Sequence, residues 1–493
     1  FQMPATSSVE VGERVAVGEK RGSVRYIGAV DGYEGEWIGI EWDEPSRGKH
    51  DGLVRGKRYF RTSHPTGGSM VRPDVVLRGR DLLYEVADRY NADENVGQFC
   101  IGKKEIVFKL ENVTSLTSRQ KQLRTLRCIC LRSALVSHAQ PVKDDGPSFP
   151  FCTELGLYEN LLHRWSDVMD CLQHTPNIVE LVLWRNLLEH VTDESYLSNL
   201  PRCSTLRHLV LTECRLDEIT IHCALSLFPN LEELYASWNA LTAYLIPLGN
   251  SAANLTHIDL ECNLIASFHD ICQLRLLPRL EKLSLASCRL KRIELEEDVG
   301  FPALTTLNLK DNLIDEWQSI TELARLPRLA TLFIDCERFR AEFGLDAREV
   351  VIAKLPSLAN LEKCILSVVE RRSAELRFLN KYAAKKEEEI RAEGHEEDIK
   401  RLTQIHGPPV FDTMKKLQMV RLCFATADKT LPPRPLPTTL PVHKVEEMAK
   451  RLLGLNRIDQ LFLEQNGFAI PLNNPMRLLS FYEPQNGDKI KVT

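Results

Sequence analysis

The sequence predicts a multidomain α+β protein, in which a small β-barrel is followed by a solenoid of short repeats and then by a small domain of strands and one helix. Three observations carry this prediction. Glycine-punctuated strand segments occupy residues 9–78, a leucine pattern recurs through residues 123–380, and residues 410–493 have a strand, helix, strand, strand order. The length of 493 residues agrees, because an ordinary domain has about 150 residues.

Composition is that of an ordinary folded protein, with 27% charged and 43% hydrophobic residues. A net charge of −5 argues against a wholly basic surface for nucleic acid. No apolar run approaches the ~18 residues that span a bilayer, and the first residues lack a secretory pattern, so we expect a cytoplasmic protein without membrane or nucleic-acid partners. The 14 cysteines include no CxxC pair, so we expect buried, reduced thiols and no metal site.

The middle of the chain repeats the pattern L-x-x-L-x-L-x-x-N-x-L at intervals of 24 to 28 residues. Clear copies begin at Ile178, Leu206, Leu231, Leu255, Leu280, Leu304 and Leu329, and weaker copies begin at Leu126 and Cys152. The ninth positions are Ala134, Asn160, Asn186, Cys214, Asn239, Asn263, Cys288, Asn312 and Glu337. A coincidental leucine-rich helix would not keep Asn or Cys in register, so we predict a leucine-rich-repeat solenoid with an internal hydrogen-bonding ladder.

The ends of such a solenoid need caps, because a single repeat cannot bury its own apolar edge. Residues 81–122 are expected to form the N-terminal edge, with a hairpin through Ile106, Phe108 and Leu110. The segment Ala347 to Leu379 resembles the helical C-terminal cap of intracellular leucine-rich-repeat proteins. Residues 381–409 are rich in both charge signs and almost without an apolar stripe, so we predict a solvated helix or spacer, a charged linker.

The concave face of the solenoid is the predicted interaction surface, read from the fifth and seventh positions of the repeat. Exposed aromatic side chains there are typical of protein interfaces, which favours Trp184 and Tyr235. The alternative, that these rings pack on neighbouring strands or on another domain, stays open. The predicted concave-face residues are Tyr158, Trp184, Tyr235, Asp259, Glu261, Lys310 and Phe333.

The N-terminal module carries an ordered set of glycines and aromatics: Gly22, Gly28, Trp37, Gly39, the block Gly48-Lys49-His50-Asp51-Gly52, and the block Gly56-Lys57-Arg58-Tyr59-Phe60. Residues 9–78 thereby resemble the CAP-Gly domain of microtubule-associated proteins. The resemblance implies a small β-barrel that binds acidic C-terminal tails ending in an aromatic residue, such as the Glu-Glu-Tyr end of α-tubulin. His50 departs from the family, which usually has Asn there.

The charge of this module fits an acidic peptide, because residues 47–80 contain nine Lys or Arg and two Asp. Lys49 is expected to pair with the terminal carboxylate, Tyr33 and Trp37 to flank the terminal ring, and Arg72 to meet the upstream acids. His50 is expected to make binding pH-sensitive near ~6.5. Core packing of Trp37 and a merely solvated basic run are the alternatives. The predicted peptide-binding residues are Tyr33, Trp37, Gly48, Lys49, His50, Asp51, Gly52 and Arg72.

The last domain has one amphipathic helix among its strands, with Val445, Met448, Ala449, Leu452 and Leu453 on one face. Its order and its ~80-residue size resemble a ubiquitin-like β-grasp domain. The proline-rich run from Pro432 to Pro441 falls where a second strand is expected. Recognition by proteasome-related ubiquitin receptors is one expectation for this domain, and a purely structural role is the other.

The order of the three modules resembles the tubulin-specific chaperone E (tubulin-folding cofactor E) family over nearly the whole chain. The resemblance implies a cytoskeleton-associated chaperone that captures α-tubulin and works with tubulin cofactors B, C and D to assemble or dissociate the αβ heterodimer. It implies neither a cofactor nor covalent chemistry, and the sequence contains no phosphate loop or nucleophile–base motif, so we do not expect an enzyme. The alternative is a microtubule-associated adaptor whose repeats bind a non-tubulin partner.

Overall fold

The computed structural model describes residues 9–91, 97–101, 104–108, 123–143, 146–192, 194–243, 252–340, 345–409, 419–426, 428–455, 457–465 and 467–492. The chain divides into two compact units, Phe1–Pro409 and Val410–Thr493, and each is described by itself. Across the described ranges, none of the helices combines the length and the apolar character that crossing a bilayer requires.

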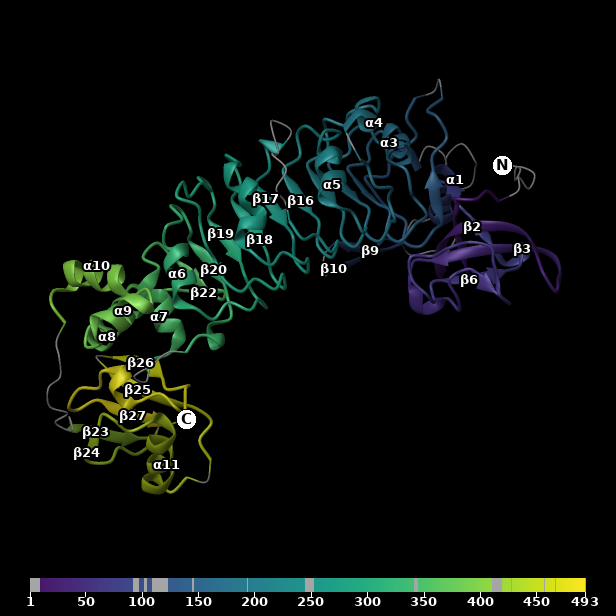
Figure 1. Ribbon diagram of the computed structural model, residues 1–493. Helices are drawn as coiled ribbons and strands as arrows, with labels where there is room; N and C mark the ends of the chain where they lie inside the picture. Colours follow the sequence, from purple (N-terminus) through teal and green to yellow (C-terminus); the bar gives the residue numbers. More distant parts are fainter. Residues whose placement is uncertain are drawn as a thin grey trace. The chain divides into compact units, whose positions relative to one another are not determined.

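The first unit begins with an antiparallel five-stranded sheet in the order β6-β3-β2-β1-β7 (Figure 1). The sequence predicts a small β-barrel here; in the strand pairing among the described residues, β6 and β7 end the sheet without pairing with each other, and Gly68 of β6 bridges instead to His50. Pro73 begins a 3-10 turn between these two short strands, and a proline nitrogen has no hydrogen to donate to a ladder. The elements are β1 (Arg14–Val17), β2 (Lys20–Val30), β3 (Tyr33–Trp42), η1 (Pro45–Arg47), β4 (Leu53–Val54), β5 (Lys57–Arg58), β6 (Gly68–Val71), η2 (Pro73–Val75) and β7 (Leu77–Arg78).

A single residue, Gly79, joins this sheet module to the repeats. The strand before it, β7, pairs with β1, whereas the strand after it, β8 (Arg80–Asp81), pairs in parallel with β12 (Val136–His138) of the repeat region. A β-carbon at Gly79 would lie 2.1 Å from Ser137 Oγ, so the two strands approach closely at this point. The repeat core therefore begins directly after Gly79.

The N-terminal edge of the solenoid contains a helix and a hairpin. Helix α1 (Leu82–Asn91) follows β8 at once and buries Leu82 and Val86 completely in the repeat core. The expected hairpin is present as the antiparallel pair β9 (Gly97–Ile101) and β10 (Lys104–Phe108), which includes Ile106 and Phe108. Leu110 lies outside the described residues.

The repeats form one eleven-stranded sheet in sequence order, with parallel pairing from β11 to β21. Each parallel strand is two or three residues long, and the leucine or isoleucine at the centre of every three-residue strand of this sheet is buried in the core. The residues that flank it vary from exposed to buried, and in β15, β16 and β17 they are half-buried. The constant register confirms the predicted repeat. The strands are β11 (Cys128–Cys130), β13 (Glu154–Gly156), β14 (Glu180–Val182), β15 (His208–Val210), β16 (Glu233–Tyr235), β17 (His257–Asp259), β18 (Lys282–Ser284), β19 (Thr306–Asn308), β20 (Thr331–Phe333), β21 (Asn360–Leu361) and β22 (Cys364–Ile365).

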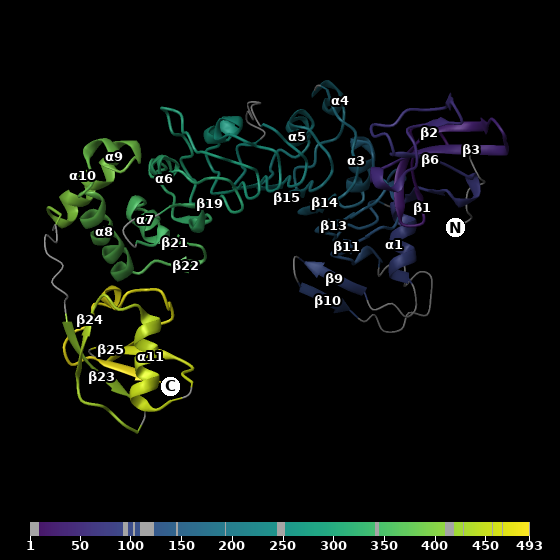
Figure 2. The ribbon, with the colours of Figure 1, turned by 60° about the horizontal axis from the view of Figure 1, so that its bottom comes forward.

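Short helices and 3-10 turns return the chain on the opposite side of the core from the strands (Figures 1 and 2). Their buried faces complete the interior, as in α5, where Ile221, Ala224 and Leu225 are enclosed. These elements are α3 (Trp165–Gln173), α4 (Glu194–Ser198), α5 (Glu218–Leu225), η4 (Phe268–Leu276), α6 (Trp317–Leu323) and η5 (Cys336–Arg338).

The predicted ladder is present at the ninth position of the repeat. Asn263 shows the pattern, because its Oδ1 accepts from the backbone N–H groups of Asn239 and Leu241 at 3.0 Å, while its Nδ2 donates to the carbonyls of Ala236 and Leu260. Where cysteine occupies this position, the thiol donates instead, as Cys214 does to the Leu183 carbonyl at 3.1 Å. Burial raises the pKa of Cys214 to about 12, so it stays protonated and keeps this role.

The C-terminal cap corrects one prediction from the sequence. Residues 381–409, expected to be a solvated linker, include two helices that pack against the cap, and Leu402 is fully buried. The packing depends on Lys354, whose buried ammonium donates to Asp398 Oδ2 at 2.6 Å and to the Gly394 carbonyl at 2.7 Å and lies 3.2 Å from His395 Nδ1. The cap helices are α7 (Ala347–Lys354), α8 (Val368–Tyr382), α9 (Glu387–Ala392) and α10 (Glu396–His406).

The second unit is a five-stranded sheet, in the order β24-β23-β27-β25-β26, packed against one helix (Figure 2). Val445 and Ala449 are buried under the sheet, as the helical pattern predicted. The proline-rich run does contain a strand, β24, which prolines tolerate because it lies at an edge of the sheet. The elements are β23 (Met419–Ala425), β24 (Arg434–Pro437), α11 (Val442–Leu453), β25 (Leu461–Gln465), β26 (Phe468–Pro471), η6 (Leu479–Tyr482) and β27 (Lys489–Val492).

Candidate peptide-binding site and repeat face

An aromatic cluster, consisting of Tyr33, Trp37, Arg55 and Arg72, lies at one end of the sheet module. The ring centroids of Tyr33 and Trp37 are 5.6 Å apart in an edge-to-face arrangement. The Arg72 guanidinium lies 3.9 Å from the centre of the Trp37 ring, and that of Arg55 lies 4.5 Å from the centre of the Tyr33 ring. Two aromatic rings and two cations thus stand together, a combination that suits an aromatic residue beside carboxylates. The sequence did not single out Arg55.

The second part of the site is the Lys49 loop, residues 48–52. The backbone N–H groups of Lys49 and His50 donate to the Gly68 carbonyl at 2.7 and 3.1 Å, which ties the loop to β6. Gly48 is required, because a β-carbon there would lie 2.0 Å from the Thr66 carbonyl oxygen. The Lys49 side chain is exposed, and within the described residues its ammonium forms no ion pair.

Strand β6 sets the distance between the two parts. Its first residue, Gly68, holds the Lys49 loop, whereas its last residue, Val71, pairs with Ile38 next to Trp37 and precedes Arg72. A strand rises about 3.4 Å per residue, so the two parts are about 10 Å apart along β6. This span matches about three residues of an extended peptide.

Two of the predicted peptide-binding residues serve the loop itself. Asp51 accepts a hydrogen bond from the Arg58 guanidinium at 2.8 Å, and this bond is the largest cause of the lowered pKa of Asp51. Gly52 has a φ of +92°, and a β-carbon there would lie 2.2 Å from the Phe60 carbonyl oxygen. We infer that these two residues hold the loop in shape while Lys49 is left free for a ligand.

We expect the sheet module to lose thermal stability as the pH falls below 6.5 because of His50. The Gly52 backbone N–H donates to His50 Nδ1 at 3.0 Å, so the neutral ring carries its hydrogen on Nε2, and protonation of Nδ1 breaks this bond. Burial is the main cause that lowers the pKa of His50 below its usual 6.5. The stability contribution is therefore complete above pH 6.5 and is lost as pH falls through the lowered pKa.

The measurement is the melting temperature of wild type and of His50→Asn between pH 5 and pH 7.5. The asparagine does not titrate in this range, and all other titrating groups are shared, so the difference between the two proteins isolates His50. A constant difference across the range would contradict the prediction.

Trp184 and Tyr235, the two aromatic residues favoured as contacts on the concave face, both interact with neighbouring side chains. Trp184 is half-buried, donates its indole N–H to Glu213 Oε2 at 3.2 Å, and has the Arg185 guanidinium 5.0 Å from its ring centre. Tyr158 meets it edge to face at 6.2 Å. Tyr235 donates to Glu233 at 2.7 Å, and burial followed by this bond raises the pKa of its hydroxyl.

Three other predicted residues of the repeat face, Asp259, Glu261 and Lys310, are polar and form a polar belt along β17 to β19 with the partners that they bind. Asp259 accepts from the Ser237 hydroxyl at 2.8 Å, and burial raises the pKa of its carboxyl group. Glu261 accepts from Ser284 and Asn308 at 2.5 and 2.9 Å. At the far end, Lys310 pairs with Glu362 at 3.1 Å, and Phe333 is half-buried on β20.

Sequence reasoning missed Trp238, whose side chain is 61% exposed. It occupies the eighth position of its repeat, whereas the concave face was read from the fifth and seventh positions. The signal was available, because the eighth positions of the neighbouring repeats are Glu213 and Cys262 and no other aromatic residue occupies the equivalent position in the other repeats.

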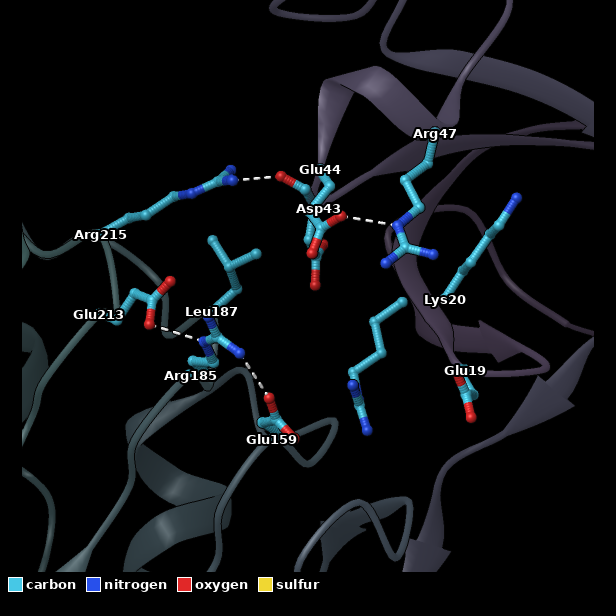
Figure 3. Close-up of a pocket in the computed structure, with 11 residues that line it drawn as sticks. Glu19, Lys20, Asp43, Glu44, Arg47, Glu159, Arg185, Leu187, Glu213 and Arg215 are labelled. Carbon is cyan, nitrogen blue, oxygen red and sulfur yellow. Dashed lines mark hydrogen bonds and ion pairs between the residues drawn. The ribbon is translucent and has the colours of Figure 1, made fainter.

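The sheet module contacts the repeats through charged side chains around a small cavity of about 120 Å³ (Figure 3). Arg215 of the repeats donates to the backbone carbonyl of Asp43 in the sheet module. Arg185 bridges Glu159 and Glu213 at 2.8 and 2.6 Å on the repeat side of the cavity. Because acids and bases balance there, the cavity resembles a contact between modules rather than a ligand site.

No group of His, Cys, Asp or Glu side chains with the arrangement of a metal site occurs in the part of the chain that the structure describes. The described cysteines are free thiols.

Comparison with known proteins gives matches along the chain. The CAP-Gly domain family matches residues 11–76. Tubulin-specific chaperone E of Rattus norvegicus is 32% identical over 98% of this chain and 98% of its own length, and that of Danio rerio is 32% identical over the same shares. The solution structure of the C-terminal ubiquitin-like domain of mouse tubulin-specific chaperone e is 27% identical, covers 16% of this chain and 90% of its own, and has a TM-score of 0.15. The identity to full-length relatives over nearly the whole chain shows that it belongs to the tubulin-specific chaperone E family.

Proposed function

We propose that this chain is a tubulin-folding cofactor that captures α-tubulin with two surfaces. The Lys49 loop and the aromatic cluster bind the acidic C-terminal tail, and the repeats bind the folded body. Together with tubulin cofactors B, C and D, the chain assembles or dissociates the αβ heterodimer in the cytoplasm, without covalent chemistry of its own. The observation that carries the proposal is an exposed Lys49, without an ion pair in the described residues, on a loop that is held at Gly68 of β6. Gly68 lies three residues along β6 from Val71, which precedes Arg72 of the Trp37 and Arg72 pair.

The distribution of charge supports a peptide with several carboxylates. Within residues 47–80, five of the nine bases already pair with acids, which reduces the free positive charge. The bases without such an ion pair in the described residues are Lys49, Arg55, Arg61 and Arg72. Three of these belong to the two parts of the site, so the remaining field is concentrated where the tail is proposed to bind.

The test is binding of a synthetic α-tubulin tail peptide to the full chain. Lys49→Ala is expected to weaken binding about tenfold, roughly 1.4 kcal/mol, because it removes the partner of the terminal carboxylate. The matched control is Lys57→Ala, an exposed lysine of the same module that already pairs with Asp31 at 3.0 Å, and it is expected to change binding less than twofold. Equal affinity of wild type and Lys49→Ala, or no preference for a peptide that keeps its terminal tyrosine, would rule out the tail site.

The competing function is a microtubule-associated adaptor whose repeats hold a non-tubulin protein. A chaperone should bind unpolymerised tubulin and increase the rate at which αβ heterodimers exchange subunits, whereas an adaptor should bind polymer and leave that rate unchanged.

For the second unit we propose recognition by proteasome-related ubiquitin receptors. Retention of such receptors by the full chain, and loss of retention when residues 410–493 are deleted, would support it.

A further inference from the structure

Trp238 stands at a backbone position that suits it poorly. Its φ is +61°, in the left-handed region, where asparagine, aspartate and glycine are favoured and a bulky side chain is disfavoured. The turn of the repeat imposes this geometry, since the equivalent residues Glu213, Cys262, Ser287 and Asp311 all have a φ of +56° or +57°. The conformation is thus general, and only the tryptophan is unusual.

Folding does not account for this tryptophan. Its side chain is 61% exposed, so it leaves a large apolar surface in water. Within the described ranges, its indole takes part in no ring stacking, cation contact or hydrogen bond. Trp184, by contrast, is enclosed by Tyr158, Arg185 and Glu213.

Trp238 lies where the surfaces of the proposed function meet. On one side, the N–H of Glu213 donates to the Ser237 carbonyl, and Arg215, two residues further on, contacts Asp43 of the sheet module. On the other side, the Trp238 N–H donates to the carbonyl of Glu261, a member of the polar belt. Leu264 of that next repeat is also exposed.

We propose that Trp238 is the main anchor on the repeats for the folded body of the protein whose acidic tail occupies the Lys49 site. This inference rests on the proposed function and adds the residue and the chemistry of the second contact. The occupant is a folded protein surface with an apolar pocket for the indole and basic groups around it. The basic groups are inferred from Glu233 and Glu261, two acidic residues on this part of the concave face. Exposed tryptophans in such settings carry a large share of binding energy.

The test compares Trp238→Asn with wild type in two binding assays and one stability assay. Asparagine accepts the left-handed backbone, so the unfolding midpoint is expected to stay equal or rise. Binding to purified αβ-tubulin is expected to weaken at least tenfold, and binding to the α-tubulin tail peptide to change less than twofold. Trp238→Phe is expected to retain part of the affinity. The matched control is Asp311→Asn, at the same position of a later repeat, with unchanged affinity for both ligands.

The outcomes separate this inference from the proposed function. Unchanged binding of αβ-tubulin to Trp238→Asn overturns the anchor, and so does a parallel loss of peptide binding, because the effect would then be indirect. If Lys49→Ala leaves peptide binding intact, the tail site fails, whatever Trp238 does. Loss of αβ-tubulin binding in Trp238→Asn alone, with stability preserved, establishes the anchor.

Discussion

Alanine in place of Lys354 is expected to lower the free energy of unfolding of the first unit by about 3–5 kcal/mol. The substitution removes the ammonium group from Asp398, which is 5% exposed and keeps only the Arg401 guanidinium, at 3.2 Å, as an ion-pair partner among the described residues. The Gly394 carbonyl loses a donor as well. The measurement is urea unfolding, together with hydrogen exchange of the backbone amides of α10, which should become the least protected of the cap.

The control for Lys354 is Lys400→Ala on the same helix that carries Asp398. Lys400 is 57% exposed in its side chain and bridges Glu396 and Glu397 at 2.9 and 3.0 Å, so its loss should cost no more than about 0.5 kcal/mol. A double variant, Lys354→Met with Asp398→Leu, should recover part of the stability, because it removes both charges of the buried pair but also takes the Asp398 carboxylate from Arg401. Equal losses for Lys354→Ala and Lys400→Ala would show that burial of the pair does not matter.

The second large effect is expected at the centre of the ladder. Asn263→Ala should destabilise the repeats by about 3 kcal/mol, because it leaves the backbone N–H groups of Asn239 and Leu241 without an acceptor inside the solenoid. It also removes one of two donors from each of the Ala236 and Leu260 carbonyls. Thermal unfolding followed by circular dichroism measures the loss.

Asn263→Cys is the matched comparison, because cysteine fills the same position in two other repeats. The Cys288 thiol donates to the Leu260 carbonyl at 3.1 Å, which shows that a thiol can replace the donor function of the amide. We therefore expect the cysteine variant to lose about half as much stability as the alanine variant. A cysteine variant as unstable as the alanine variant would mean that shape, not hydrogen bonding, governs this position.

The periodic parts of the fold could be predicted from the sequence, and the contacts between distant segments could not. The repeat was visible because the buried leucines and the ninth-position amides recur at a fixed interval. The segment after the cap, residues 381–409, was misjudged because charge balance in residues 381–401 indicates a solvated helix or spacer, whereas the decisive partner, Lys354, precedes Asp398 by 44 residues. The charge composition of a segment does not reveal an ion pair with a residue so far away in the chain.

The site could be predicted from the sequence where the backbone tolerates only one residue type at a position. Gly48 and Gly52 occupy backbone positions where a β-carbon would clash, which a glycine pattern can report. The exposure of the two tryptophans of the repeat face was harder to predict, because a shift of one position in the repeat decides whether the ring is enclosed by neighbours or faces solvent. Trp184, at the seventh position, meets Glu213 and Arg185, whereas Trp238, at the eighth, faces solvent.

The one-residue joint at Gly79 has a consequence for the reach of any ligand that spans both modules. Two Cα–Cα steps, at most about 7.6 Å, separate the last residue of β7 from the first residue of β8. This chain therefore has no flexible linker at this joint that could bring the folded body of a ligand to the repeats once the tail of the ligand is held at Lys49. The flexibility must come from the ligand, so the number of flexible residues between its folded body and its terminal carboxylate decides whether both contacts form at once. The same number sets the effective concentration of the second contact.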